Sequence, residues 1–497
     1  MSKIKNSFVC ENCGVEHSKW KGQCPFCKEW NSIVEQIINE QPTKRWNKNY
    51  DLKEIIPTKL DNIDINNEKR IFTNDPEFDR VLGGGIVPGC VILIAGEPGI
   101  GKSTLLLQIC SKIKSSVLYV SGEESLTQIK IRSNRINFKK SDFYVLNETD
   151  SEKIFYNITK IKPNLLIIDS IQTVTSSLIS NSIASVSQIR KCTSDLIDFA
   201  KKTNTPVFLI GHITKDGSIA GPKVLEHMVD TVIQFEGDQD NNYRIIRANK
   251  NRYGATNEIG IYEMNESGLR VVKNPNRYLI SNKNIKKSGH AIGCSIQGIR
   301  PLMIEVQALV SSAVYGTPQR STTGFNSKRL NMILAILEKR AGIQIGSKDV
   351  FLNITGGISI DDPSIDLAVI SSIISSHENI PIERNICFAG EIGLSGELRG
   401  ISKLKERLSE AEKLGFSSSW LFEHHFSGFG QPSCSLNLLC YFSGITSKIR
   451  LGSAVLVIPW HNPILVAEQI GTLDVVSNGR YDFGVGRGYR DNEFKPR

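Results

Sequence analysis

One stretch decides the fold of this chain: Gly96-Glu97-Pro98-Gly99-Ile100-Gly101-Lys102-Ser103. It follows an apolar run at residues 91–95, which is typical of a buried strand, and it leads into residues 104–109, which open a helix. Strand, glycine-rich loop and helix form the arrangement in which backbone N–H groups and a helix N-terminus converge on an anion. The stretch therefore predicts a phosphate-binding loop in an α/β fold. A chance glycine turn is the alternative, and both flanks argue against it.

Two side chains of this loop carry its chemistry. Lys102 is expected to reach the β- and γ-phosphates of a nucleoside triphosphate, and Ser103 to complete the coordination of a Mg²⁺ ion between them. ATP and Mg²⁺ are therefore the predicted cofactors. The expected ATP-binding residues are Gly96, Glu97, Pro98, Gly99, Ile100, Gly101, Lys102, Ser103 and Thr104.

The composition narrows the class of protein. At 497 residues the chain is too long for one ordinary core, so roughly two to four domains are expected. A net charge of +9, from 60 basic and 51 acidic residues, is compatible with a nucleic-acid partner without requiring one. No apolar stretch reaches membrane-spanning length, and the N-terminus lacks the apolar core of a signal peptide. A cytoplasmic protein without a membrane partner is expected.

Four of the eleven cysteines lie in one N-terminal cluster. Cys10 and Cys13 form one CxxC pair, and Cys24 and Cys27 form another. Four thiolates with no open position describe a structural Zn²⁺ site, and so small a segment depends on the metal for its stability. Redox chemistry is the alternative, although it needs only one pair.

The segments around this cluster are also predicted. A zinc finger is expected over residues 7–35, followed by a polar linker over residues 36–56. His17 lies between the two pairs, and because four sulfurs complete the metal shell, it is interpreted as a surface residue.

Residues 57–275 alternate apolar strands with helical stretches, the pattern of a parallel sheet covered on both faces. The strand at residues 165–168 ends at Asp169, which is the Walker B arrangement and predicts a carboxylate beside the magnesium ion. The strand at residues 206–210 leads to His212, which either senses the γ-phosphate or is a structural histidine.

Two carboxylates follow the strand at residues 116–120, namely Glu123 and Glu124. Because strands of a parallel sheet present their carboxyl ends to the ligand crevice, one of them is placed to orient a water molecule for attack on the γ-phosphate. A solvated acidic turn is the alternative.

Several motifs in order resemble the RadA (Sms) family of bacterial DNA repair proteins. They are the four-cysteine cluster, Leu82-Gly83-Gly84-Gly85-Ile86, Tyr119-Val120-Ser121-Gly122-Glu123-Glu124-Ser125 and Asn249-Lys250-Asn251-Arg252-Tyr253-Gly254. The resemblance covers roughly residues 7–416. It implies a RecA-like ATPase core between a zinc finger and a Lon-protease-like domain, with Glu123 as the residue that activates water. It further implies a homo-hexameric motor that moves along single-stranded and branched DNA, with the recombinase RecA as a partner.

The last of these motifs matches the family signature Lys-Asn-Arg-Phe-Gly, with Tyr253 in place of Phe. The resemblance implies that Lys250, Asn251, Arg252, Tyr253 and Gly254 couple ATP to DNA. Lys250 and Arg252 would act in translocation, or would stabilise phosphate charge across a subunit boundary. The residues alone describe only a basic hairpin.

Residues 285–416 resemble the Lon-like domain of the same family, truncated at its end. Ser364 falls where the protease has its serine, and Lys405 lies in a segment similar to the protease's lysine segment. A lysine activates a serine only when burial lowers its pKa, and the carboxylate of Asp366 would keep it charged. A scaffold that assembles the ring and contacts DNA is therefore expected, rather than proteolysis.

Residues 417–497 resemble the luciferase-like flavin monooxygenases, which are (β/α)8 barrels. Residues 411–416 suit either family, so the chain is interpreted as a fusion that ends in a partial TIM barrel. Uncovered strand edges and apolar faces predict a poorly folded tail. Glu423, His424 and His425 suggest a metal site, but neighbours on a strand point to opposite faces, which disfavours it.

The leading hypothesis is a DNA-dependent ATPase or helicase of homologous recombination and DNA repair, which drives branch migration. One alternative is a KaiC-like ATPase that acts on a protein partner, and another is flavin-dependent monooxygenation by the C-terminal fragment. A third is a nucleotide-binding module without motor activity, if the truncated Lon-like domain prevents assembly.

Overall fold

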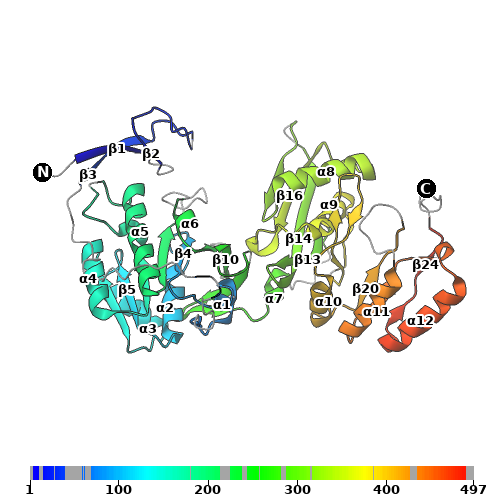
Figure 1. Ribbon diagram of the computed structural model, residues 1–497. Helices are drawn as coiled ribbons and strands as arrows, with labels where there is room; N and C mark the ends of the chain where they lie inside the picture. The colour runs from blue at the N-terminus through cyan, green and yellow to red at the C-terminus, as the bar shows by residue number, and fades with distance from the viewer. Residues whose placement is uncertain are drawn as a thin grey trace. The chain divides into compact units, whose positions relative to one another are not determined.

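The computed structural model divides the chain into two compact units, Met1–Val272 and Lys273–Arg497, which are drawn in Figure 1. None of the helices in the described part of the chain is long and apolar enough to cross a membrane. The structure describes residues 4–10, 15–26, 28–39, 59, 61, 69–179, 181–212, 224–237, 243–256, 258–280, 287–313, 316–383, 385–425 and 434–488.

The N-terminal ribbon is a small antiparallel sheet. Strand β1 (Ile4–Cys10) pairs with both β2 (Glu16–His17) and β3 (Ile33–Asn39). Its described core consists of Cys10, Cys24 and Ile33, with Phe8 packed against them. An apolar core of this size is too small to hold a domain together, which agrees with a metal-dependent fold.

The first unit is built on one nine-stranded sheet, in the order β12-β11-β10-β9-β4-β8-β7-β5-β6. The six strands from β9 to β6 in this order run parallel, whereas β10, β11 and β12 are antiparallel. The strands are β4 (Val91–Gly96), β5 (Val117–Ser121), β6 (Phe143–Asn147), β7 (Leu165–Asp169), β8 (Val207–His212), β9 (Thr231–Glu236), β10 (Tyr243–Asn251), β11 (Ile259–Asn265) and β12 (Gly268–Val271).

Helices cover both faces of this sheet, as the alternating pattern predicts. On β4, Ile92 and Ile94 pack into one core, and Val91, Leu93 and Ala95 pack into the other, because successive side chains of a strand point to opposite faces. The first core receives α1 (Pro76–Val81), α2 (Lys102–Lys112) and α3 (Leu126–Arg135); the second receives α4 (Ser151–Ile161), α5 (Val186–Thr203) and α6 (Val224–Met228).

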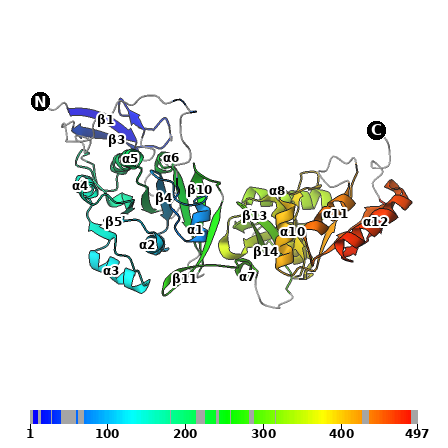
Figure 2. The ribbon, with the colours of Figure 1, turned by 60° about the horizontal axis from the view of Figure 1, so that its bottom comes forward.

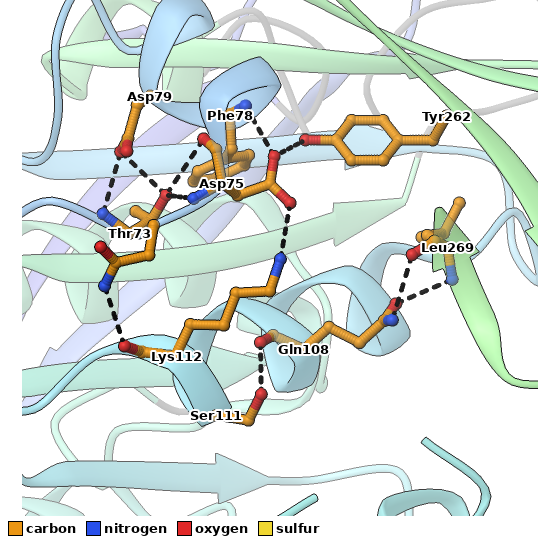
Figure 3. Close-up of polar contacts among 10 residues, drawn as sticks. Thr73, Asp75, Phe78, Asp79, Gln108, Ser111, Lys112, Tyr262 and Leu269 are labelled. Atoms are coloured by element: carbon orange, nitrogen blue, oxygen red, sulfur yellow. Dashed lines mark hydrogen bonds and ion pairs between the residues drawn. The ribbon is translucent and has the colours of Figure 1, made fainter. Parts of the chain in front are cut away.

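A polar network holds helix α2, which starts at the phosphate loop, in place (Figure 3). The Gln108 side chain accepts from Leu269 N at 2.8 Å and donates to Leu269 O at 3.1 Å, so it completes the edge of β12. Lys112 Nζ lies 3.0 Å from a carboxylate oxygen of Asp75, whose other oxygen accepts from Tyr262 Oη at 2.8 Å. Asp75 also caps α1 through Phe78 N, so one carboxylate joins α1, α2 and β11.

The second unit begins with a five-stranded sheet in the order β15-β16-β14-β13-β17, followed by the short pair β18 and β19. Helix α9 packs along β13 and β14 in this unit. The elements are α7 (Asn276–Leu279), β13 (His290–Gln297), β14 (Arg300–Ser312), β15 (Arg320–Thr323), α8 (Ser327–Ala341), β16 (Lys348–Ile354), α9 (Asp366–Glu378), β17 (Cys387–Phe388), β18 (Glu391–Ile392), β19 (Leu398–Arg399) and α10 (Leu404–Lys413).

The C-terminal segment forms a parallel sheet in the order β20-β21-β23, and a separate pair, β22 with β24. Its core includes Leu439, Leu451 and Leu473, and uncovered apolar side chains remain, among them Ile464 and Val475 at 72% and 75% exposed. The segment therefore differs from the expected poorly folded tail in having a packed core, and it keeps apolar side chains uncovered. The elements are β20 (Ser418–Leu421), α11 (Ser435–Ile445), β21 (Arg450–Ser453), β22 (Leu456–Val457), α12 (Pro463–Ser477), β23 (Tyr481–Asp482) and β24 (Val485–Gly486).

The segment at α10 joins the two parts of this unit. Ala411 and Phe416 pack against the apolar cluster of β13 and β14, and they also pack against the cluster of α11 and α12. Figure 2 shows α10 between β14 and α11. The predicted crossover segment thus contributes to both apolar clusters. The C-terminal segment therefore begins in contact with the apolar cluster of the Lon-like sheet.

Candidate nucleotide-binding and hydrolysis site

The phosphate loop leaves the end of β4 and enters α2 at Lys102. Gly101 has a φ of +116°, which residues with a side chain rarely adopt, and a Cβ there would lie 2.6 Å from the terminal methyl carbon of the Met264 side chain on β11. A Cβ on Gly96 would lie 2.8 Å from Phe235 Cβ. The loop therefore needs glycine both for its backbone conformation and for its contact with β9 and β11.

Lys102 lies over this loop. Its Nζ donates to Gly96 O at 2.7 Å and to Glu97 O at 2.8 Å. Burial lowers the Lys102 pKa to about 8, although the charges of Asp169 and Glu123 act in the opposite direction. A phosphate in the loop would add negative charge beside this ammonium group and favour its charged form.

Asp169 ends β7 and is buried. The hydroxyl of Tyr119, itself fully buried on β5, donates to Asp169 Oδ2, and Ser103 hydrogen-bonds to the same hydroxyl. Burial, with the adjacent Asp169 charge, raises the Tyr119 pKa well above its ordinary value. Tyr119 thus joins the two expected magnesium ligands, a role that the sequence alone does not establish. The sequence contains one indication of this role, namely that the strand at residues 117–120 is apolar except for the hydroxyl group of Tyr119.

Glu123 follows β5 and faces the same edge of the sheet. Its Oε1 accepts from Ser170 Oγ at 2.5 Å and lies 3.0 Å from His212 Nε2. The hydrogen bond from His212 lowers the Glu123 pKa to about 2, with help from Ser170 and against the effect of burial. Glu124 instead pairs with Arg132. The geometry therefore supports Glu123, and not Glu124, as the water-orienting carboxylate.

His212 stands between two of these groups. Its Nδ1 lies 3.4 Å from Lys102 Nζ, and its Nε2 faces Glu123. Both ring nitrogens point at charged groups of the site, which supports the γ-phosphate sensor more than an isolated structural histidine. Residues 213–215, which continue the chain after His212, lie outside the described residues.

The basic motif at the end of β10 is tied to α6. Lys250 Nζ donates to Glu226 O at 2.8 Å, His227 O at 3.0 Å and Val229 O at 2.8 Å. Burial lowers the Lys250 pKa. Arg252 lies 3.2 Å from Asp230. Lys250 therefore stabilises the C-terminal end of α6. This contact with a helix goes beyond what a basic hairpin alone would make.

The other residues of this motif are placed by contacts within the same unit. Asn251 Oδ1 accepts from Tyr253 N at 3.0 Å, and Tyr253 Oη lies 3.1 Å from Lys201 Nζ. Lys201 also pairs with Asp230 at 2.7 Å, so the motif closes around one buried carboxylate.

The ribbon presents two buried thiols, Cys10 and Cys24. Cys24 O accepts from Lys28 N at 2.8 Å, and Cys24 N donates to Glu29 O at 2.9 Å, so a tight turn carries this thiol. Cys13 and Cys27 lie outside the described residues. His17 Nε2 lies 3.6 Å from Cys24 Sγ, so His17 is not the plain surface residue that the sequence suggested. Sulfur donors in such turns fit Zn²⁺.

The Lon-like domain does not form a serine–lysine pair at Ser364 and Lys405. Ser364 Oγ donates to Cys294 O at 3.0 Å and accepts from Arg407 Nη1 at 2.7 Å. Arg407 is buried and also pairs with Asp362 at 2.8 Å. A guanidinium group stays protonated and cannot act as a general base.

Asp366 is also placed differently from the sequence expectation. It is fully buried and pairs with Arg329, not with a lysine, and burial raises its pKa. The region around Ser364 is therefore a network of buried ion pairs and hydrogen bonds.

The fold and the site define a RecA-like P-loop ATPase with a zinc ribbon before it and a Lon-like domain after it. Residues 59–218 match the AAA domain family, residues 8–35 the rubredoxin metal binding domain family, and residues 341–423 the Lon protease (S16) C-terminal proteolytic domain family. Residues 385–496 match the luciferase-like monooxygenase family. The last two matches overlap across α10, the helix that contributes to both apolar clusters.

Curated relatives identify the family. The chain is 44% identical over 437 residues to the DNA repair protein RadA of Bacillus subtilis, covering 87% of this chain and 95% of the relative. It is 44% identical over 423 residues to RadA of Listeria monocytogenes, covering 84% and 92%. The chain belongs to the RadA family of DNA repair proteins. A solved structure, of the RadB recombinase, overlaps 41% of this chain and all of its own, at 20% identity and a TM-score of 0.33.

Proposed function

We propose that this protein is an ATP-driven motor of DNA recombination and repair, which translocates on single-stranded and branched DNA. One observation carries the proposal: Lys102, Glu123 and Asp169 come from three different strand ends, and they meet at one edge of a parallel sheet. Such an edge is where open α/β sheets bind their ligands. Membership of the RadA family supports recombination and repair as the process that this ATPase serves.

The roles of the side chains follow from their environments. Lys102 would neutralise charge on the transferring phosphoryl group, and ionised Glu123 would orient the attacking water. Ser103 and Asp169 would hold Mg²⁺, which supplies positive charge at the phosphates when bound. Tyr119 positions Asp169 for this task, because its hydroxyl contacts both ligands.

The motor step is proposed to run through His212 and Lys250. His212 ends β8 beside Glu123, and the chain that continues from it reaches α6, whose last carbonyls accept from Lys250. A γ-phosphate that displaces His212 is proposed to act on α6, because Lys250 binds the last carbonyls of that helix. Coupling of this kind requires two discrete arrangements of Lys250 and α6, biased by nucleotide.

DNA contact is also proposed for the zinc ribbon. Trp20 and Trp30 are 58% and 67% exposed, and both rings lie near Gly22. Lys19 and Lys21 flank Trp20. Exposed aromatic rings among lysines suit the stacking of unpaired bases and the contact of phosphates. Hexamer formation and the partner RecA remain proposals from the family resemblance.

The test compares ATP hydrolysis and strand movement in one set of variants. Single-stranded DNA should stimulate hydrolysis by the wild-type protein, and Lys102→Ala should abolish it. Lys250→Ala should keep nucleotide binding and lose branch migration. Hydrolysis that DNA leaves unchanged would instead favour the ATPase that acts on a protein partner, and normal branch migration by Lys250→Ala would remove its proposed role.

A further inference from the structure

Three side chains converge in the C-terminal segment, at the carboxyl ends of its parallel strands. Glu423 and His425 follow β20, and His461 follows the turn Ile458–Trp460 after β22. In parallel α/β architectures, this end of the strands is where ligands bind. The segment lies outside the ATPase unit, and the proposed motor function does not use it.

The ligand atoms of these three residues are close together. Glu423 Oε1 lies 3.1 Å from His425 Nε2 and 2.9 Å from His461 Nε2, and all the candidate ligand atoms lie within 4.8 Å of one another. Ligands on a tetrahedral Zn²⁺ ion are separated by about 3.4 Å, because zinc–nitrogen and zinc–oxygen bonds are about 2.1 Å long. A small outward shift of the two rings is enough to admit the ion.

The surroundings hold these atoms in position. The second oxygen of Glu423 accepts from Val457 N at 2.6 Å, so Oε1 is directed at the two imidazoles. The His425 ring stacks on Trp460, with ring centroids 5.1 Å apart. Partners of this kind, behind the ligands, orient a metal site before the metal arrives.

Burial adds an electrostatic reason for a cation. The Glu423 side chain is fully buried, whereas His425 and His461 are 14% and 23% exposed. Glu423 pairs with these two histidines, which carry a positive charge only when they are protonated, and a buried carboxylate without a cationic partner is costly. A divalent cation bound between the three side chains would compensate the charge of Glu423 and bind the two neutral imidazoles.

We propose that Glu423, His425 and His461 form a Zn²⁺ site with one open coordination position. Two nitrogen ligands and one carboxylate are a set that zinc accepts in open sites. From the sequence, Glu423, His424 and His425 are neighbours on a strand whose side chains point to opposite faces, which disfavours a metal site. Glu423 and His425 nevertheless share a side, because residues two apart in an extended chain do so, and the third ligand, His461, comes from a distant turn.

The test measures zinc in the purified full chain. We expect two zinc ions per chain, one in the ribbon and one at this site. His461→Gln and Glu423→Gln should each lower the content to one, whereas the matched control His424→Gln should keep two. Combined Cys10→Ser and Cys24→Ser should leave one zinc, because the ribbon and this site lie in different compact units.

Cobalt substitution identifies each site independently of folding yield. Co²⁺ in the ribbon produces sulfur-to-metal charge-transfer absorption, whereas Co²⁺ on nitrogen and oxygen ligands produces only weak d–d bands. A wild-type chain with one metal ion, lost entirely in the double cysteine variant, would overturn the proposal. Equal zinc loss in His424→Gln and His461→Gln would also overturn it.

Discussion

Gly83 and Gly254 are pressed against each other although 171 residues separate them. A Cβ built on Gly83 would lie 2.7 Å from Gly254 Cα, and a Cβ built on Gly254 would lie 2.8 Å from Gly83 Cα. Arg70 spans the contact, since its guanidinium donates to Gly83 O and to Tyr253 O. The contact therefore joins two of the motifs that define the family, the glycine run before β4 and the basic motif after β10.

Gly254→Ala should destabilise the ATPase unit. The new methyl group meets backbone that cannot rotate away, and such overpacking typically costs about 1–3 kcal/mol. Thermal unfolding of the full chain should show a lower midpoint for this unit. Gly444→Ala is the control, because nothing lies within 4 Å of its Cβ, and an unchanged midpoint for Gly254→Ala would contradict the close contact.

Glu123→Gln should abolish hydrolysis and keep ATP binding, because the amide cannot orient water as the carboxylate does. Glu124→Gln is the matched control, since Glu124 faces Arg132 and should retain most of the turnover. Single-turnover hydrolysis and nucleotide titration measure the two effects. Loss of turnover in Glu124→Gln with activity kept in Glu123→Gln would reverse the assignment.

Tyr119→Phe should raise the Mg²⁺ concentration needed for half-maximal hydrolysis while the fold is kept. The change removes only the hydroxyl that contacts Asp169 and Ser103, and a hydrogen bond to a charged group contributes about 1.5–3 kcal/mol. Tyr144→Phe, on the exposed side of β6, serves as the control. An unchanged Mg²⁺ requirement would show that Asp169 needs no such support.

ATP binding should weaken as the pH rises above about 8. In the nucleotide-free protein, the Lys102 pKa is about 8, below its ordinary value, so the amine loses its charge above that pH, while phosphate binds the charged form. Binding then takes up a proton, and the affinity falls by up to about tenfold per pH unit. Nucleotide titration between pH 7 and 10 measures the slope. Lys102→Arg stays charged, so any binding it retains should show no such slope.

Protonation of Glu123 should not limit the rate of hydrolysis until the pH is well into the acid range. The Glu123 pKa is held at about 2, first by the hydrogen bond from His212. Removing that donor in His212→Phe should raise the Glu123 pKa and move the acid limb of the kcat profile to higher pH. A limb at the same pH in both proteins would mean that His212 does not set the Glu123 charge.

Features carried by contiguous residues could be predicted from the sequence. The phosphate loop and Asp169 after its apolar strand are each complete within a few residues, and the two cysteine pairs lie in one short segment, residues 10–27. Chain order also predicted the parallel sheet, because strands and helices alternate along the ATPase core.

Pairings between distant residues could not be predicted in this way. Tyr119 and Asp169 are 50 residues apart, and Glu123 and His212 are 89 apart. They meet because the sheet places β5, β7 and β8 side by side. Arg407, and not the expected Lys405, contacts Ser364. The rotation of α10 about its own axis decides which of its side chains faces β13.

Contiguous residues were therefore enough to predict the class of protein and the phosphate loop. The tertiary structure alone decided which polar groups share a site: Tyr119 with Asp169, His212 with Glu123, and His461 with Glu423. The reason is physical. Local spacing reports the conformation of one segment, whereas a site is made when separate segments bury their apolar faces together and bring their polar ends to the same edge.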